Sequence, residues 1–281
     1  MEEIGYEVTD IKEFPERNIC FGVIYIPGEG RVNVAIKIRD QKQNSHECEM
    51  LQSLDGKNVV RCFGMGYYVD FNGNRHYGVI TERAISDLVD YYDSNYYDFD
   101  LPLKITILHR IAKCIEYIHN MGVYHNDIKL DNILVREMML LRPDVCLFDF
   151  DQSQMFGNLN QCEYGTPQYA PPETGKGPLT PKADVFAFGC CILYFLMDII
   201  PRMGPIELYR RARGRFCSKE LFVPFIEILD RIMVEDPSDR PTMGEIVELL
   251  GSMTSSCENI LSSLEPESDS DNDDFLTDNT Q

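Results

Sequence analysis

Short apolar runs with strand-like spacing dominate the first hundred positions of the chain. They combine β-branched and aromatic residues with turn-forming neighbours, a pattern typical of strands. The predicted strands are Asn18–Ile26, Asn33–Ile38, Asn58–Met65 and His76–Glu82. One stretch among them, His46–Leu54, places Met50, Leu51 and Leu54 at helical spacing instead and predicts a single helix.

Helical spacing takes over from Leu103 onward. Apolar residues recur every three or four positions between Ile105 and Ile118, which predicts one amphipathic helix. Further helices are predicted over Asp184–Met197, Ser218–Val234 and Thr242–Leu250. The first of these is apolar on every face and too short to span a membrane, so we interpret it as a buried central helix. This order of elements predicts a β-rich N-terminal lobe followed by a larger helical lobe.

The charge of the chain is strongly negative and unevenly placed. The net charge is −20, and ten acidic residues follow Arg240, the last basic residue. We predict a folded domain over residues 1–251 and a disordered acidic tail over residues 252–281, because the tail has too few apolar residues to offset the entropy of ordering. The acidic balance argues against nucleic-acid binding and against a broad basic face for anionic membranes.

The ten cysteines are scattered and form no C-x-x-C pair. Several lie inside apolar runs, as expected of small buried thiols. The N-terminus has no pattern of a secretory signal. These features predict a reducing compartment, the cytoplasm or the nucleus.

Candidate chemistry begins at two carboxylates, Asp149 and Asp151, which follow an apolar run. Strand alternation would place them on one face, where they could hold a metal, perform acid/base chemistry or simply decorate a strand end. Five other blocks accompany this one in a fixed order. The six blocks are Val34–Lys37, His125–Asn132, Asp149–Asp151, Gly165–Glu173, Asp184–Gly189 and Asp236–Thr242.

Together, the six blocks closely resemble the signature set of eukaryotic protein kinases of the Ser/Thr type, over about residues 10–250. The resemblance implies a bilobal α+β kinase fold, with one key helix in a small lobe over about residues 1–83 and a larger helical lobe over about residues 84–251. It further implies ATP and Mg²⁺ as cofactors, Ser/Thr protein substrates, no membrane partner and a monomeric chain. The compact domain and reduced glycine loop resemble divergent, virus-encoded kinases, in which case the location would be the host cell.

The resemblance assigns catalytic roles to four residues. Lys37 would hold the α- and β-phosphates as a compact cation, and Glu47 would position it, with Glu49 as the alternative. Asp127 would accept or orient the proton of the substrate hydroxyl. Lys129, two residues later, would contact the transferred phosphate, as in Ser/Thr kinases.

The resemblance also assigns the nucleotide site. Asn132 and Asp149 would bind Mg²⁺, which favours few protein ligands of this oxygen type. Thr81 would be the gatekeeper, with backbone groups of Glu82 and Ala84 reading adenine. Three aliphatic residues would sandwich the ring, and one glycine would remain from the glycine-rich loop. These four residues are Ile24, Ala35, Leu134 and Gly22.

Three departures separate this chain from the family pattern. Arg17 and Ile19 stand where the first two glycines of the loop are expected, which predicts a looser or reshaped lid. Asn126 replaces an arginine that normally meets a phosphorylated activation loop, so activity should not depend on that switch. Asp151 replaces a glycine, where its carboxylate could repel phosphate or point to solvent. It should also restrict the inward and outward flip of Phe150.

Two hypotheses of function follow from different classes. The first is an active Ser/Thr protein kinase, and the alternative is a pseudokinase that binds ATP without efficient transfer. A small-molecule kinase is disfavoured by the blocks Gly165–Glu173 and Asp236–Thr242. A basic cluster is interpreted either as a docking site for acidic peptides or the chain's own tail, or as a solvated helix face. Its residues are Arg202, Arg210, Arg211, Arg213 and Arg215.

Overall fold

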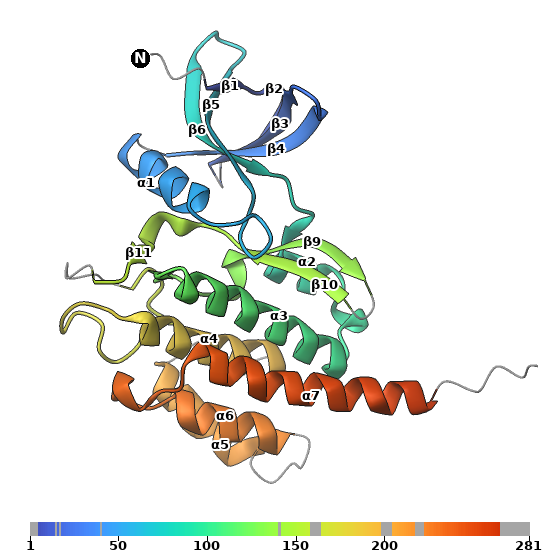
Figure 1. The fold of residues 1–281 in the computed structure, drawn as a ribbon, viewed down its shortest axis with the longest axis vertical. Helices are drawn as coiled ribbons and strands as arrows, with labels where there is room; N and C mark the ends of the chain where they lie inside the picture. Colours follow the sequence, from blue (N-terminus) through green and yellow to red (C-terminus); the bar gives the residue numbers. More distant parts are fainter. Residues whose placement is uncertain are drawn as a thin grey trace, which may run out of the picture.

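The computed structural model describes residues 5–14, 16, 18–39, 41–139, 142–157, 164–197, 204–216 and 222–264. Figure 1 shows a curled β-sheet with one helix, α1, at one end of the molecule and helices α3 to α7 at the other. The predicted α+β architecture, a small β-rich lobe and a larger helical lobe, is therefore confirmed.

The N-terminal lobe is a six-stranded sheet with strand order β1-β5-β6-β4-β3-β2. Its strands are β1 (Tyr6–Glu7), β2 (Thr9–Phe14), β3 (Ile19–Ile26), β4 (Gly30–Ile38), β5 (Cys62–Val69) and β6 (Arg75–Glu82). The four predicted strands correspond to β3 to β6. The sequence pattern gives no signal for β2, because most of its residues are polar and exposed.

The register of β3 against β4 decides which side chains face the other lobe. Ile19 lies opposite Lys37, and Phe21 lies opposite Ala35. Since side chains alternate between the two faces of a strand, Cys20, Gly22 and Ile24 share the opposite face. There Ile24 is 1% exposed and packs in the core of the N-terminal lobe.

Helix α1 (Gln41–Gln52) begins five residues earlier than predicted. The apolar pattern did not reveal its first turns because their residues are polar. Its buried residues Cys48 and Leu51, with Leu54 beyond its end, do not join the core of the N-terminal sheet. They pack instead in the larger core that continues through Val59, Leu147 and the helices of the C-terminal lobe. Helix α1 of the N-terminal lobe therefore packs against the core of the C-terminal lobe and links the two lobes.

The C-terminal lobe is built around α4 (Pro181–Met197), in which every residue from Ala183 to Leu196 is buried. The prediction of a buried central helix is confirmed, and within the described residues no helix has the length and apolar character of a bilayer span. The surrounding helices are α2 (Leu88–Ser94), α3 (Leu101–Asn120), α5 (Pro205–Phe216), α6 (Val223–Ile232) and α7 (Met243–Leu264). Helix α5 is highly polar, and its pattern predicts no element with these bounds.

Helix α7 is longer than the helix predicted for this part of the chain. It continues to Leu264, whereas the sequence pattern predicts a helix ending at Leu250 and a disordered tail from residue 252. The sequence is compatible with this longer helix, because apolar residues recur at helical spacing at Met253, Ile260 and Leu264. Residues 265–281 of the predicted tail lie outside the described residues.

Short elements between the lobes carry the candidate chemistry. Three strands form one small sheet, β7 (Ser86–Asp87), β9 (Ile133–Met139) and β10 (Arg142–Leu147), and two form another, β8 (Val123–Tyr124) and β11 (Gln154–Met155). Short 3₁₀ turns η2 (Tyr96–Asp98), η3 (Leu130–Asn132), η4 (Phe150–Gln152) and η6 (Pro237–Asp239) complete the fold. Turns η3 and η4 place the His125–Asn132 and Asp149–Asp151 blocks.

A buried ion pair fixes the segment that follows these blocks. The Arg240 guanidinium, whose side chain is 0% exposed, donates to both carboxylate oxygens of Glu173 at 2.6 and 2.7 Å. It also donates to the backbone carbonyls of Lys182 and Val234. Because a buried charge must be paired, this contact ties the Gly165–Glu173 block to the base of the helical lobe.

Candidate active site

The loop before Asp127 is held from below by the carboxylate of Asp184 at the start of α4. This carboxylate accepts hydrogen bonds from the backbone N–H groups of His125 at 2.7 Å and Asn126 at 2.9 Å. His119 on α3 contacts the same carboxylate at 3.0 Å. Asn126 adopts a left-handed backbone conformation, with φ of 63°, which asparagine tolerates better than most residues. The loop conformation is thus built into the core.

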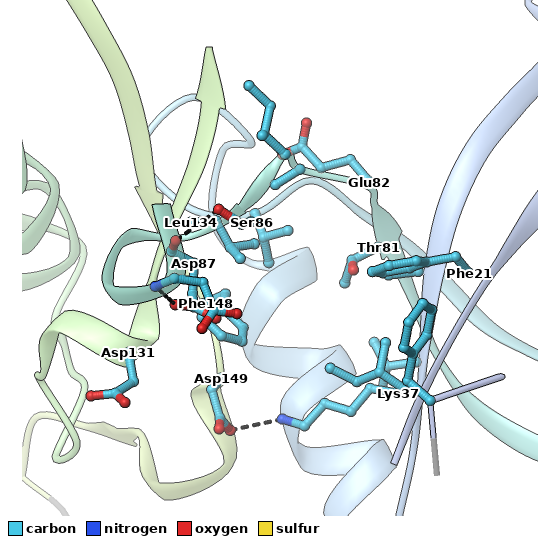
Figure 2. Close-up of a pocket in the computed structure, with 18 of the residues that line it drawn as sticks. Phe21, Lys37, Thr81, Glu82, Ser86, Asp87, Asp131, Leu134, Phe148 and Asp149 are labelled. Carbon is cyan, nitrogen blue, oxygen red and sulfur yellow. Dashed lines mark hydrogen bonds and ion pairs between the residues drawn. The ribbon is translucent and has the colours of Figure 1, made fainter. Parts of the chain in front are cut away.

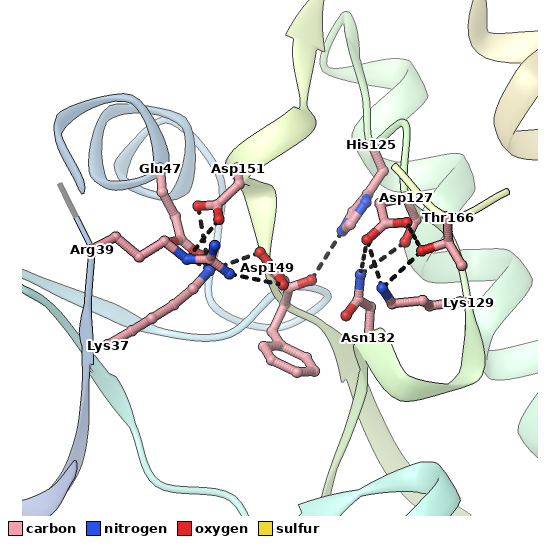
Figure 3. Close-up of polar contacts among 11 residues, drawn as sticks. Lys37, Arg39, Glu47, His125, Asp127, Lys129, Asn132, Asp149, Asp151 and Thr166 are labelled. Atoms are coloured by element: carbon pink, nitrogen blue, oxygen red, sulfur yellow. Dashed lines mark hydrogen bonds and ion pairs between the residues drawn. The ribbon is translucent and has the colours of Figure 1, made fainter. Parts of the chain in front are cut away.

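Asp127 lies at the centre of a closed group of polar side chains (Figure 3). The Thr166 hydroxyl donates to one carboxylate oxygen at 2.6 Å, and the Lys129 ammonium donates to the other at 2.8 Å. Lys129 also donates to Thr166 at 2.9 Å. The Asn132 amide nitrogen donates to the backbone carbonyl and to the carboxylate of Asp127, both at 2.9 Å. The structure therefore brings Lys129, Asn132 and Thr166 together at Asp127.

The structure explains why residue 165 is a glycine, which the sequence alone does not reveal. A Cβ atom at this position would lie 2.7 Å from Cγ of Asp127 and 2.8 Å from its carboxylate oxygen. The backbone before Thr166 therefore approaches Asp127 too closely for any side chain.

Lys37 on β4 lies among three carboxylates from two other elements. Its ammonium donates to Glu47 on α1 at 2.9 Å, to Asp149 at 2.7 Å and to Asp151 at 3.3 Å. The structure places Glu47, which is 3% exposed, against Lys37, whereas the alternative Glu49 is exposed. One cation thus joins a strand, a helix and the Asp149–Asp151 block.

A second cation completes this group, which we call the Lys37 cluster: Lys37, Arg39, Glu47, Asp149 and Asp151. The Arg39 guanidinium lies 2.8 Å from the Asp151 carboxylate and 3.6 Å from that of Asp149. The side chain of Asp151 is only 5% exposed, so the interpretation that it points to solvent is wrong. Two cations and three carboxylates leave the cluster with a formal charge of −1 when all five groups are ionised.

The pKa values of the cluster follow from burial and from these contacts. Burial alone would lower the pKa of the Lys37 ammonium, but its carboxylate partners outweigh burial and raise the pKa above its ordinary value. Burial opposes ionisation of Asp149, but the contact with Lys37 holds the pKa of that carboxyl below its usual range. Burial raises the pKa of Glu47 to about 7, against the attraction of Lys37.

Asp149 and Phe150 turn their side chains in different directions. Asp149 has a left-handed backbone conformation, with φ of 65° and ψ of 66°, and projects its carboxylate toward Lys37. Phe150 is fully buried, with its ring 4.7 Å from that of His125. The predicted restriction of the flip of Phe150 stays a prediction, but the ring lies inward in this structure.

A cavity of about 750 Å³ opens beside the Lys37 cluster, between the two lobes. Figure 2 shows Phe21, Thr81 and Lys37 from the sheet facing Leu134 and Phe148 from the other lobe. The predicted residues Ala35, Thr81, Glu82, Ala84 and Leu134 all line it. Lining residues that the sequence interpretation missed include Ile19, Phe21, Arg39, Val60, Val79 and Phe148.

Two predicted contacts with the nucleotide are corrected by the register of β3. Ile24 and Gly22 face away from the cavity, and Ile19 and Phe21 take the places expected of them. A Cβ on Gly22 would lie 2.5 Å from the side chain of Val8 and 2.7 Å from a backbone oxygen of β2. Gly22 therefore serves the packing of β2 on β3. Matching the single glycine to the end of the glycine-rich loop shifted the sequence alignment along the strand.

Glu82 also differs in detail from its predicted role. Its backbone N–H donates to the carbonyl of Arg61 at 2.9 Å, so only its carbonyl is left to read a base. Its carboxylate binds the Arg136 guanidinium, with contacts at 2.6 and 2.9 Å. This ion pair fixes the connection between the lobes at the edge of the cavity.

The segment after Asp151 is tied to both lobes by uncharged contacts. The Asn126 side-chain amide donates to the carbonyl of Gln152 at 3.1 Å. His46 on α1 contacts the carbonyl of Ser153 at 2.9 Å. The backbone N–H of Ile128 donates to the Tyr164 hydroxyl at 2.8 Å. Asn126 therefore contacts the segment after Asp151 directly. The arginine that the family pattern has at this position would contact that segment through a phosphorylated residue.

Four residues of the basic cluster, Arg210, Arg211, Arg213 and Arg215, lie on α5 and are exposed. Arg211 pairs with Glu207 at 2.9 Å one turn away, and Arg213 pairs with Asp230 on α6 at 2.8 Å. These intrachain pairs favour the interpretation of Arg210, Arg211, Arg213 and Arg215 as a solvated helix face. Docking of the chain's own tail concerns residues outside the described part of the chain, as does Arg202.

Comparison with known proteins identifies the family. A sequence model of the protein kinase domain matches residues 31–249, so the chain belongs to the protein kinase family. It is 33% identical over 146 residues to CBL-interacting serine/threonine-protein kinase 20 of Arabidopsis thaliana, covering 50% of this chain and 33% of that protein.

Two further relatives match more of the chain. Serine/threonine-protein kinase WNK of Caenorhabditis elegans is 26% identical over 221 residues, covering 74% of this chain and 12% of that protein. Probable serine/threonine-protein kinase gdt2 of Dictyostelium discoideum is 26% identical over 272 residues, covering 87% and 16%. The chain thus spans about a third or less of the length of these relatives.

The placement of Gly22 predicts the effect of adding a single methyl group. Gly22→Ala should lower the free energy of unfolding by about 1–3 kcal/mol, because the new Cβ overlaps β2. The control is Gly214→Ala on the exposed face of α5, where nothing lies within 4 Å of the new atom and the change should be neutral or stabilising by up to about 1 kcal/mol. Equal stabilities of the two variants in urea unfolding would contradict the observed register.

The raised pKa of Glu47 predicts a pH dependence of stability. The unfolded chain ionises this carboxyl near 4.5 and the folded chain near 7, so the folded state binds more protons between these values. Its contribution to stability is therefore present below 4.5 and is lost as the pH rises to about 7.

Relative to Glu47→Gln, the nucleotide-free wild-type chain should lose free energy of unfolding over this pH range. The control is Glu49→Gln, which makes the same change at an exposed residue of the same helix. Its free energy of unfolding should depend on pH as that of the wild type does. Parallel curves for wild type and Glu47→Gln, measured by denaturant unfolding at a series of pH values, would show that the folded chain does not hold this proton.

Proposed function

We propose that the chain is a Ser/Thr protein kinase that transfers the γ-phosphate of ATP to a protein hydroxyl. The strongest support is the closed group around Asp127, in which Lys129 and Thr166 contact its two carboxylate oxygens at 2.8 and 2.6 Å. This group adjoins the loop residue Asp131, which lines the cavity together with Lys37 and Asp149. A positioned base and a nucleotide-sized cavity are the two parts that phosphoryl transfer requires.

The residues suggest a direct in-line transfer. The substrate hydroxyl oxygen attacks the γ-phosphorus, and the bond from that phosphorus to the β–γ bridging oxygen breaks with its electron pair leaving on ADP. The hydroxyl proton passes to the carboxylate of Asp127. Lys129, 2.8 Å from this carboxylate, places a positive charge where charge develops on the transferred group. Lys37, fixed by Glu47, holds the phosphates that stay with ADP.

The donor set also fits a magnesium ion. Asn132 directs its amide N–H groups to Asp127, which turns its amide oxygen away as a potential ligand. Asp149 offers a carboxylate on the cavity wall. Oxygen ligands of this kind, few in number, are what Mg²⁺ takes from proteins when phosphate and water complete its shell. When bound, the ion would neutralise charge on the phosphate oxygens.

The alternative is a pseudokinase that binds ATP without efficient transfer. Residues 15–18, which connect β2 to β3, contain no glycine, and this favours weaker binding of phosphate by backbone N–H groups. The assembled Lys37–Glu47 pair and the group around Asp127 favour transfer.

The proposal predicts the loss of transfer in two variants. Asp127→Asn removes the proton acceptor and should lower the rate by about 10²–10⁴-fold. Lys37→Met removes the central cation of the cluster and should also reduce transfer to background. The assay follows γ-phosphate transfer to a generic acceptor protein, with phosphoserine and phosphothreonine identified in the product.

Matched controls are Asp98→Asn and Lys42→Met, since both residues are exposed and lie outside the cavity lining. Both should retain wild-type rates. If the wild type stabilises on ATP addition but transfers no phosphate with either Mg²⁺ or Mn²⁺, the pseudokinase becomes the better account.

A further inference from the structure

The roof of the cavity lacks the usual means of holding phosphate. Strand β2 ends at Phe14 and β3 begins at Ile19, so residues 15–18 alone connect them, and none is glycine. Glycine-rich turns hold phosphates by bringing backbone N–H groups close to them. Ile19, opposite Lys37 on the adjoining strand, presents only an aliphatic side chain to the cavity. Among the described residues, we therefore look for a positive partner of phosphate on other elements of the cavity wall.

A second cation, Arg39, lies beside Lys37 on the wall of the cavity. Ala35, Lys37 and Arg39 occupy alternate positions along β4 and the residue that follows it, and all three line the cavity. Figure 3 shows Lys37 and Arg39 reaching side by side toward the carboxylates of the cluster. The Arg39 side chain is 36% exposed, so a ligand in the cavity can reach its guanidinium.

The carboxylate of Asp151 holds the Arg39 side chain in place. Asp151 is two residues beyond Asp149, as Arg39 is two residues beyond Lys37, and the two added residues form an ion pair at 2.8 Å. Arg39 is also 3.6 Å from Asp149. Without Arg39 the cluster would carry a formal charge of −2 beside a polyphosphate, and with it the charge is −1. The arginine and the aspartate therefore form a balanced addition to the cluster.

We propose that Arg39 binds the phosphate groups of the nucleotide beside Lys37, and that Asp151 positions its guanidinium for this contact. The inference rests on the proposed function, since it takes ATP to be the ligand of the cavity. A guanidinium suits the role because its planar set of donors can contact a neighbouring carboxylate and a phosphate oxygen together. Arg39 thereby takes over part of the work of the missing glycine-rich turn.

The test is a binding measurement that does not depend on phosphate transfer. Affinities for ATP, ADP and adenosine are measured by calorimetry for the full chain and its variants in the presence of Mg²⁺. Arg39→Gln should weaken ATP binding by about tenfold or more, as expected for the loss of a charged hydrogen bond, and should leave adenosine binding unchanged. Arg39→Lys keeps the charge but not the planar set of donors. Its affinity for ATP should lie between that of the wild type and that of Arg39→Gln.

Arg31→Gln is the matched control. Arg31 lies on the same strand, outside the cavity lining, and pairs with Asp10 on the protein surface. It should leave all three affinities unchanged. An equal loss of ATP and adenosine affinity in Arg39→Gln would show a structural defect and overturn the inference. So would an unchanged ATP affinity, or a wild-type chain that binds ATP no more tightly than adenosine.

The positioning role of Asp151 is tested by a double-mutant cycle. In an Asp151→Asn background the cluster has one negative charge fewer, and Arg39 has lost its closer carboxylate while Asp149 at 3.6 Å remains. Arg39→Gln should then weaken ATP binding by several-fold less than it does in the wild type. An equal effect of Arg39→Gln in both backgrounds would show that the two residues act independently and would overturn the positioning role.

The outcome separates this inference from the proposed function. A chain that transfers phosphate but binds ATP equally well with and without Arg39 refutes the inference and leaves the kinase intact. A chain that needs Arg39 to bind ATP but transfers nothing supports the inference for a pseudokinase.

Discussion

The contact between the Lys37 ammonium and its carboxylate partners is the interaction on which the rest of the structure depends. Lys37 belongs to the sheet, Glu47 to α1, and Asp149 to the segment that leads to the helical lobe. The partly buried Lys37 ammonium satisfies the buried carboxylate of Glu47 and the partly buried carboxylate of Asp149, and so helps to hold these three elements together. Buried charges of this kind contribute little net stability, since desolvation offsets attraction. Their effect is to fix geometry, and the geometry they fix is that of the cavity wall.

The same constraint explains the two additions to the cluster. A third carboxylate in this position would be unfavourable without a further cation, and Asp151 is accompanied by Arg39 at 2.8 Å. The formal charge of −1 is the same with both residues present as with both removed. The pair also ties the start of the segment after Asp149 to the N-terminal lobe. A departure from the family pattern that looks damaging in isolation is therefore compensated two residues beyond Lys37.

The segment after Asp151 is held without a phosphate group. Asn126 and His46 bind backbone carbonyls at Gln152 and Ser153. The two hydroxyls that precede Thr166 in this segment are buried and already bonded: Ser153 donates to the carbonyl of Phe150, and Tyr164 accepts from Ile128. Neither is positioned to receive a phosphate. In the described part of this segment, these contacts support the proposal that the kinase does not depend on a phosphorylated residue here.

Much of the fold and the site could be predicted from the sequence, because the polar blocks have fixed spacings within loops. Lys129 and Asn132 were assigned to the same site as Asp127, and the structure places both there, with Thr166 of the Gly165–Glu173 block beside them. The face of β3 could not be predicted, because a shift by an odd number of residues reverses every side chain and only the pairing with β4 fixes the register. Arg39 was missed for a related reason, since its role appears only when Asp151 is seen to point inward. Helix α5 and strand β2 were missed because few of their residues are apolar.

The most direct test of this account is the time course of phosphate transfer by a chain that carries no phosphate of its own. The purified chain is treated with a phosphatase, freed of it, and mixed with Mg·ATP and a generic acceptor protein, with Asp127→Asn as the blank. The account predicts transfer that is linear from the first time point, at the rate of the untreated chain. Transfer that is absent after phosphatase treatment, or that begins after a lag removed by preincubation with ATP, would contradict it.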